Sequence, residues 1–530
     1  MQSAITRNAF ESYQQTTKVY NLKVTFVQSE GESLAIEYLS SILKSHEHKT
    51  SLAFDPRLFD SSSLQNSYLM KTFDTKMELV KEIKRMKPDL IGFSVYTGNY
   101  QWALSMARLI KRELDVPVIF GGVHPTLVPE TVIRGECVDM LCVGEGEYAL
   151  LELVGDLEQG RVNYETKNIW FKKEGKVIRN DVRPPLKNLD DLPFPDKDLY
   201  YECQPFNGIY MIMASRGCSF ACTFCCNFCL RSIYGQKGRH VRRRSVKNVI
   251  DELIWMKTKF KAKYVDFPDD VFTSDIKWLE EFSKEYRSTV DLPFSCITHP
   301  ALVNRKAIEL LKRAGCYWLM IGVQSASESN RRSILNRFET NEQIRRVAEE
   351  CHRVRLHFSC DHIFNIPFES EKEQIEALKF CNEIRPSIIN TYWLQYYPKT
   401  EILRKAREAG ILNDATIAEI NEGKMSTSQV VGIGAHDDFN PERKFYNFAF
   451  LLNLLPLLPK WVVGKIVEKR WFMRWFKSPI WLNTLIKFVV RLRIGQSHIY
   501  FSEMKGLMYN MLRNWRLRKK YSRANKGPRK

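Results

Sequence analysis

The chain has 530 residues, 44% of them hydrophobic, 12% aromatic and 27% charged. At about 100–200 residues per domain this length predicts two or three domains, and the composition excludes a disordered or fibrous protein. The formal charge of +19 is unevenly distributed: residues 441–530 hold 21 Lys/Arg and 3 Asp/Glu, a net of +18. The body of the protein is therefore nearly neutral, and its C-terminal region is strongly basic.

The sequence carries few signs of secretion or membrane insertion. Its first fifteen residues have no basic segment leading into an apolar core, so we expect no signal peptide. No stretch reaches about 18–20 uninterrupted apolar residues, which argues against a bilayer-spanning helix. The thirteen cysteines are odd in number and scattered, a pattern that favours reduced thiols and a metal site over disulfides. We therefore expect a cytoplasmic protein.

Strand-like and helix-like segments alternate over residues 22–160, after a polar lead at residues 1–21. The predicted strands are Lys23–Gln28, Thr50–Asp55, Leu90–Ser94, Val116–Phe120 and Met140–Val143, and the predicted helices between them include Glu32–His46, Lys76–Lys87 and Tyr100–Leu114. This alternation implies right-handed crossovers and a doubly wound α/β domain with a parallel sheet. Residues 161–205, rich in proline and aspartate at Pro184–Asp196, interrupt the alternation and are interpreted as an interdomain connection.

A second α/β series occupies residues 206–415. Its predicted strands are Ile209–Ser215, Lys263–Phe267, Phe294–Thr298, Trp318–Val323, Phe358–Phe364 and Asn390–Tyr396, with amphipathic helices between them. Six βα units predict a partial (β/α)6 barrel, in which the chemistry lies at the C-terminal ends of the strands. Residues 416–530 are expected to form a helical, aromatic and basic C-terminal region.

The first strand of this series runs into a loop with three cysteines at C-x3-C-x2-C spacing, Cys218, Cys222 and Cys225. Three thiolates on one loop can hold three irons of a cubane cluster, whose fourth iron stays open to chelate a small molecule. The alternative is a zinc knuckle in which Cys226 or Cys229 supplies a fourth ligand. The preceding strand, the aromatic Phe224 and the βα units that follow favour the iron cluster.

This loop, at the end of a first barrel strand, resembles the signature of radical S-adenosylmethionine enzymes. The resemblance implies that the three cysteines ligate a 4Fe-4S cluster whose unique iron takes the methionyl end of S-adenosylmethionine. Four later strand ends resemble family motifs in the expected order: Tyr264–Phe272, Gly322–Ser325, Phe364–Glu369 and Tyr397–Thr400. Gln324 replaces the commoner Glu, and both glycines of the third motif are substituted. The implied contacts to S-adenosylmethionine are Phe224, Asp269, Asp270, Gln324, Ser325 and Pro367.

Two glycine turns, Gly121–Thr126 and Val143–Glu147, follow strands of the first domain. Glycine there lets the phosphate or amide groups of a ligand approach the backbone, although tight βα turns use glycine in any case. Beside the cysteine loop, these turns resemble the cobalamin-binding domain of a class that includes hopanoid and bacteriochlorophyll methylases and the anaerobic magnesium-protoporphyrin ester cyclase. The resemblance covers residues 22–415 and implies cobalamin contacts from Ser94, Tyr96, Gly121, Gly122, Gly144 and Glu145. The alternative is a domain that keeps this fold without the corrinoid.

A cobalt-ligating histidine in this fold would occur in the pattern D-x-H-x-x-G. None of the ten histidines has Asp two residues before it. We therefore expect cobalamin to bind without a histidine ligand from this domain. His124 is interpreted as a structural hydrogen-bonding residue.

The predicted activity is that of a cobalamin-dependent radical S-adenosylmethionine C-methyltransferase acting on an unactivated carbon. The resemblance implies that one S-adenosylmethionine methylates the corrinoid and a second yields the 5′-deoxyadenosyl radical. The alternatives are an oxidative cyclase or C–C coupling enzyme with the same cofactors, and a cobalamin-binding sensor or scaffold, against which the intact cysteine loop argues. No catalytic acid or base is identified, and a reducing partner such as flavodoxin or ferredoxin is expected.

The basic region opens with Phe445–Val467, which is apolar but interrupted by Pro456, Pro459 and Lys460, so it cannot form one straight spanning helix. Tryptophans interleave with Lys and Arg beyond it, a composition typical of the lipid headgroup region: Trp461, Trp471, Trp475, Trp481 and Trp515. Alternatively, the apolar half packs on the barrel and the basic end is solvated or binds nucleic acid, which the neutral body disfavours. We expect contact with the inner face of the membrane and a hydrophobic substrate such as a lipid, isoprenoid or tetrapyrrole.

Overall fold

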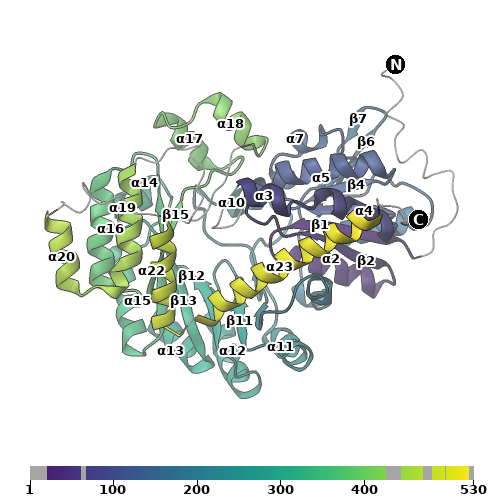
Figure 1. Cartoon of the computed structure of the whole chain (residues 1–530). Coiled ribbons are helices and arrows are strands. Elements are labelled where there is room, and N and C mark those ends of the chain that lie inside the picture. The colour runs from purple at the N-terminus through teal and green to yellow at the C-terminus, as the bar shows by residue number, and fades with distance from the viewer. Residues whose placement is uncertain (1–20, 61–66, 425–442, 470–479, 496, 525–530) are drawn as a thin grey trace.

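The computed structural model describes residues 21–60, 67–424, 443–469, 480–495 and 497–524. It consists of two α/β domains side by side and a C-terminal group of helices, the last of which crosses from the second domain to the first (Figure 1). The predicted fold class is confirmed: a doubly wound Rossmann-like domain precedes a six-stranded half-barrel and a helical C-terminal region.

The first domain is built on a seven-stranded sheet with the order β2-β1-β3-β4-β5-β6-β7. The five predicted strands are present and pair in parallel, and the three central ones, β3, β4 and β5, are nearly continuous buried apolar runs, as is typical of strands covered on both faces. Helices α4, α5 and α7 cover one face of the sheet, and α2 and α8 cover the other. The elements are β1 (Lys23–Ser29), α2 (Leu34–Ser45), β2 (Lys49–Asp55), α3 (Ser67–Phe73), α4 (Lys76–Met86), β3 (Leu90–Ser94), α5 (Tyr100–Glu113), β4 (Val118–Gly121), α6 (Val123–Leu127), α7 (Pro129–Ile133), β5 (Met140–Cys142) and α8 (Glu147–Glu158).

The segment interpreted as an interdomain connection, residues 161–205, contains two strands that were not predicted. Strands β6 (Ile169–Lys173) and β7 (Lys176–Ile178) form a hairpin that extends the first sheet in antiparallel fashion beyond β5. The remainder of this segment crosses to the second domain through the short helix α9 (Asp198–Tyr201). Just before α9, the fully buried Lys197 pairs with Glu32 and Glu37 and so anchors this segment to the first domain.

The second domain is a half-barrel of six parallel strands with the order β15-β14-β13-β12-β11-β8. Five of the six strands lie where they were predicted. The first was predicted too long: Ile209–Ser215 divides into β8 (Ile209–Met211), which joins the half-barrel, and β9 (Ser215–Arg216), which pairs with β10 (Arg242–Arg243). The bounds of the others are β11 (Tyr264–Phe267), β12 (Phe294–Thr298), β13 (Cys316–Gln324), β14 (His357–Phe364) and β15 (Ile388–Trp393).

Helices alternate with these strands, and those of ten or more residues pack on the outer face of the half-barrel, where they form the largest apolar cluster with alternate strand residues such as Leu319 and Ile321. The helices are α10 (Cys226–Tyr234), α11 (Val246–Phe260), α12 (Ile276–Thr289), α13 (Arg305–Ala314), α14 (Glu328–Ser333), α15 (Asn341–Arg353), α16 (Glu371–Ile384), α17 (Glu401–Glu408) and α18 (Asp414–Asn421).

The C-terminal region breaks where its prolines predict. Helix α19 (Arg443–Leu454) gives way at Pro456 to a short 3-10 turn, and α20 (Lys460–Lys469) follows. The apolar half packs on the barrel, because Phe448, Leu452 and Leu455 are buried against β15 and α16. None of the described helices combines the length and apolarity needed to cross a bilayer. The remaining helices are α22 (Ile480–Arg493) and α23 (Ser497–Ala524). The predicted interfacial residues Trp471 and Trp475 lie outside the described residues.

Helix α23 connects the two domains (Figure 1). It follows α22, which packs on α19, and its far half lies against α3 and α4 of the first domain. Arg513 donates to the carbonyl of Phe54 at 2.9 Å, and Asn514 donates to that of Phe73 at 3.0 Å. Arg518 donates to several carbonyls at the end of α3, where the helix dipole is negative.

Candidate functional site

Four charged side chains join the two domains at the edge where the cysteine loop begins. Glu145, after β5, receives two hydrogen bonds from the Arg242 guanidinium, at 2.7 and 2.9 Å. Arg216, two residues before Cys218, reaches Glu147 at 2.7 Å and Glu145 at 3.4 Å. The arginines lower the pKa of the Glu145 carboxyl despite its burial. These contacts fix the cysteine loop against the C-terminal edge of the first sheet.

A cavity of about 270 Å³ lies directly behind this joint. It opens between the first sheet and helices α2 and α8, and it lies beside the switch point between β1 and β3, where doubly wound sheets bind ligands. Its walls are mostly apolar, and Met213 and Arg216 of the second domain close one side. Five of the six predicted cobalamin residues line it: Ser94, Gly121, Gly122, Gly144 and Glu145.

Two of these glycines are required by neighbouring protein groups. Gly122 and Gly144 have φ angles of 102° and 86°, in the region that favours glycine. A Cβ at Gly122 would approach the Val95 carbonyl oxygen to 2.7 Å, and one at Gly144 would approach the Tyr234 hydroxyl to 2.8 Å. Tight packing across the sheet edge therefore excludes a side chain at both positions, in agreement with the alternative that tight βα turns use glycine in any case. The approach of a ligand to these turns stays a prediction.

Tyr96 and His124 take structural partners. The Tyr96 hydroxyl donates to Glu30, and Tyr96 is not among the residues that line the cavity. His124 is fully buried beneath Tyr100, with its Nδ1 3.2 Å from the Thr97 hydroxyl, and burial lowers its pKa to about 4. His124 is not among the residues that line the cavity.

The cysteine loop lies between β9 and α10, and its three thiols differ in environment. Burial raises the pKa of Cys218 to about 11, whereas a hydrogen bond with Cys226 lowers that of Cys225 to about 7. Among the described residues, no three or more His, Cys, Asp or Glu side chains lie close enough together to hold a metal ion. The cluster assignment therefore rests on the cysteine spacing of the loop and on the family match reported below. The donor set suits the cluster: three thiols, with a guanidinium NH of Arg337 3.7 Å from the Cys222 sulfur.

The two predicted aspartates after β11 have different roles. Asp269 is fully buried and accepts hydrogen bonds from the Ser215 hydroxyl and the Ala214 amide, so it holds the strand beneath the cysteine loop. Asp270 accepts from the Asn227 amide at 2.9 Å, and its charge acts on Cys218 and Cys225. Asp270 is thus the carboxylate that faces the loop, and burial raises its pKa.

The other predicted residues lie at the ends of β13 and β14 or in the loop itself. Phe224 packs in a cluster with Ile366 and Tyr396, so the ends of β14 and β15 and the cysteine loop converge. Gln324 ends β13 with a φ of 67°, and the buried Ser325 accepts a hydrogen bond from the Ser327 amide in the next turn. Pro367 is buried in the turn after β14. Their contacts with S-adenosylmethionine stay predictions.

The substituted glycine positions keep a glycine-like backbone. Asn365, Phe368 and Lys399 have φ angles of 63°, 66° and 64°. Non-glycine residues are uncommon in this region, so three at matching motif positions indicate that the turns are preserved although the glycines are not. The large side chain of Phe368 fits at this position without displacing its neighbours, because the residue is 60% exposed.

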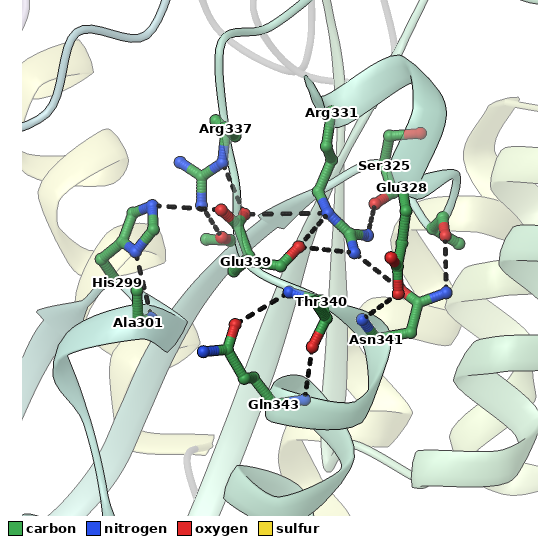
Figure 2. A network of polar contacts seen from close by, with 12 residues as sticks. His299, Ala301, Ser325, Glu328, Arg331, Arg337, Glu339, Thr340, Asn341 and Gln343 are labelled. Atoms are coloured by element: carbon green, nitrogen blue, oxygen red, sulfur yellow. Dashed lines mark hydrogen bonds and ion pairs between the residues drawn. The ribbon is translucent and has the colours of Figure 1, made fainter. Parts of the chain in front are cut away.

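A buried charged network behind the loop was not predicted (Figure 2). Arg337 donates to the carboxylate of the fully buried Glu339 at 2.7 Å, and Arg331 binds the Glu339 carbonyl. His299, at the end of β12, lies 3.5 Å from the same carboxylate and stacks on Phe220 of the cysteine loop. Burial and Arg337 lower the pKa of His299 to about 2, so it is neutral. In sequence these residues look like ordinary surface charges.

The fold, the loop and the interdomain cavity define an enzyme that unites two cofactor domains. Residues 212–381 match the Radical SAM superfamily, and residues 22–154 match the B12 binding domain. The chain therefore belongs to the radical S-adenosylmethionine enzymes that carry a B12 binding domain. Its cofactors are a 4Fe-4S cluster, S-adenosylmethionine and cobalamin.

Named relatives agree with this assignment. The chain is 28% identical to an uncharacterized methyltransferase of Pyrococcus horikoshii, over 68% of this chain and 74% of that protein. It is 25% identical to the anaerobic magnesium-protoporphyrin IX monomethyl ester cyclase of Rubrivivax gelatinosus, over 62% of this chain and 60% of that protein. Its fold is similar to that of the methyltransferase TsrM of Kitasatospora setae, with a TM-score of 0.58 and 16% identity over 72% of this chain and 77% of that one.

The interdomain joint should matter for stability. Glu145→Gln leaves Arg242, which is 8% exposed, without its carboxylate, and we expect the unfolding free energy to fall by about 3 kcal/mol. The matched control is Glu130→Gln, which breaks the exposed pair with Arg179 and should leave stability nearly unchanged. Urea unfolding measures both. Equal losses in the two variants would refute a special role for the joint.

The cluster ligands are tested one at a time. Cys218→Ala, Cys222→Ala and Cys225→Ala should each abolish reductive cleavage of S-adenosylmethionine and lower the iron content, because each removes one ligand of the cluster. Cys226→Ala should keep both properties. Iron analysis and 5′-deoxyadenosine formation under anaerobic conditions provide the measurements, and full iron loading with cleavage in Cys222→Ala would contradict the assignment.

The corrinoid should bind without a protein imidazole, because the buried His124 lies outside the cavity and the D-x-H-x-x-G pattern is absent. The Co(II) EPR spectrum of protein grown on ¹⁵N should show the same nitrogen splitting as that of unlabelled protein. A splitting that changes with the label and disappears in His124→Ala would show that the prediction is wrong.

Proposed function

We propose that the chain is a cobalamin-dependent radical S-adenosylmethionine methyltransferase that acts on an unactivated carbon of a hydrophobic substrate. The observation that carries this proposal is the wall shared by the two cofactor sites. Arg216 lines the cavity of the first domain, and Cys218 follows two residues later. Consecutive Cα atoms are about 3.8 Å apart, so the cysteine loop begins within about 8 Å of that wall.

Such proximity suits a reaction in which two cofactors act on one carbon. When bound, cobalamin supplies the methyl group, and the cluster with S-adenosylmethionine supplies the radical that removes a hydrogen atom. The residues of the chain would position the two cofactors and keep water out. The Glu145–Arg242 pair would fix the distance between the two sites, and the apolar walls of the cavity would exclude water. No general acid or base is needed for hydrogen-atom abstraction.

Exposed phenylalanines support a hydrophobic substrate. Phe228, Phe338 and Phe368 are 43%, 62% and 60% exposed, and each lies on a segment that follows the C-terminal end of a strand. Phe228 also lines a second cavity of about 530 Å³, shared by α10 and Trp170 of the first domain. Single exposed apolar residues are ordinary, but three on the side of the half-barrel that bears the cysteine loop favour an apolar ligand.

A second candidate is an oxidative cyclase with the same cofactors, which the 25% identity to the magnesium-protoporphyrin cyclase favours. Similarity to proteins named as methyltransferases, including the phosphonate methyltransferase of Streptomyces wedmorensis at 23% identity, supports methyl transfer. The products of the two reactions differ. Methyl transfer yields S-adenosylhomocysteine and 5′-deoxyadenosine, whereas the cyclase reaction yields only the latter.

The reconstituted holoenzyme is incubated anaerobically with a chemical reductant and S-adenosylmethionine, and both products are quantified. We expect S-adenosylhomocysteine in an amount that depends on bound cobalamin, with none from protein lacking the corrinoid. Cys222→Ala is the matched control, because it should lose 5′-deoxyadenosine but retain S-adenosylhomocysteine. Formation of 5′-deoxyadenosine alone by the cobalamin-loaded enzyme would favour the cyclase and overturn the methyltransferase.

A further inference from the structure

The outer face of α23 presents a continuous row of large apolar side chains, which we call the apolar stripe. Its members are spaced at i, i+3, i+7, i+11 and i+14, so they share one face of the helix. All are at least 49% exposed: Phe501, Met504, Met508, Leu512 and Trp515. Leu485, Val489 and Leu492 of α22 are also exposed, at 47%, 40% and 44%, with the same helical spacing. The stripe thus spans about half of a 28-residue helix.

The orientation of the stripe is fixed by the opposite face of α23. Ser502, Asn510 and Asn514 on that face are buried, and Arg513 and Asn514 bind carbonyls of the first domain. The stripe must therefore point away from both domains. The stripe stays exposed because α23 is held in place: rotating the helix to bury the stripe would break the hydrogen bonds of Arg513 and Asn514 to the first domain.

The charges around the stripe are of one sign. Helix α23 contains seven Lys/Arg and a single acidic residue, Glu503. Lys505, Arg516 and Lys519 are exposed and lie within about 80° of the centre of the stripe on a helical projection. The Lys519 ammonium lies 4.8 Å from the centroid of the Trp515 ring. An apolar row with Trp and Phe, flanked by cations, has the chemistry of a helix lying in a bilayer interface.

We propose that the apolar stripe docks on the surface of an anionic phospholipid bilayer, with Phe501–Trp515 in the interface and the flanking cations on lipid phosphates. A second copy of the chain is a poorer occupant, because two stripes facing each other would bring together surfaces that both carry an excess of positive charge. An anionic headgroup layer neutralises this charge, and its acyl region accepts the apolar row. The proposal does not depend on methyl transfer.

The test uses the full-length protein without S-adenosylmethionine and vesicles of phosphatidylcholine alone or of phosphatidylcholine mixed equally with phosphatidylglycerol. We expect co-sedimentation with the anionic vesicles at low salt, little with the neutral ones, and release as salt is raised. The variant Met504→Ser/Met508→Ser/Leu512→Ser should bind at least tenfold more weakly. Arg516→Gln/Lys519→Gln should lose most of the preference for anionic lipid.

The matched control removes three other exposed apolar side chains, which lie outside the stripe. Met77→Ser/Ile254→Ser/Ile411→Ser alters residues that are 49%, 44% and 42% exposed, and it should bind vesicles within twofold of the original protein. Circular dichroism establishes that each variant is folded, and quenching of tryptophan fluorescence by brominated lipid, weakened in Trp515→Phe, provides an independent readout.

Three results would overturn the proposal. The first is full-length protein that stays in the supernatant with anionic vesicles at low salt. The second is an equal loss of binding in the control variant and the stripe variant. The third is a dimer, detected by sedimentation velocity, that the stripe variant abolishes while vesicle binding persists, since the stripe would then be an interface between copies.

Discussion

The position of the cysteine loop relative to the cavity of the first domain depends on the ion pairs of Glu145 and Glu147 with Arg242 and Arg216. All four side chains are at most 20% exposed, so separating the domains would leave charges without partners in a poorly hydrated place. Replacement of a buried pair by apolar groups often costs little stability, whereas loss of one partner costs much. We infer that the main effect of the joint is geometric: it fixes where the cysteine loop begins relative to the first sheet.

The same edge of the first sheet explains why glycine is required in the turn after β5. Gly144 precedes Glu145, and its missing side chain lets the Tyr234 hydroxyl come close enough to accept from the Glu145 amide at 2.8 Å. Tyr234 ends α10, the helix that follows the cysteines. A single contact therefore couples the turn after β5 to the helix behind the cluster loop. This contact joins the wall of the cavity to the helix that follows the loop, and the Arg242 guanidinium adds a second connection.

Much of the fold could be predicted because buried parallel strands are continuous apolar runs. The strand Leu90–Ser94 has identical bounds in sequence and structure, and the cysteine loop follows a strand end as expected. Hairpin β6–β7 was missed because it is short and partly exposed at a sheet edge. The division of roles between Asp269 and Asp270 was also invisible, since adjacent residues give no sign of which one meets Ser215. The Arg331, Arg337 and Glu339 network depends on burial by distant segments, which no local pattern records.

A half-barrel leaves a strand edge and an inner face that other segments must cover, and the basic C-terminal region does so in stages. Helix α19 lies against the edge strand β15, which removes an unpaired edge from solvent. Phe450 of α19 and Ile486 and Val490 of α22 pack on Trp318 and Ile388, on the face of the sheet opposite the outer helices. Helix α23 follows these buried segments in the chain and extends to the first domain. Its cations divide accordingly: Arg513 and Arg518 end on backbone carbonyls of that domain, and Arg516 and Lys519 remain on the outside. One helix thus stabilises the arrangement of the two domains through one face and leaves the other available for contact.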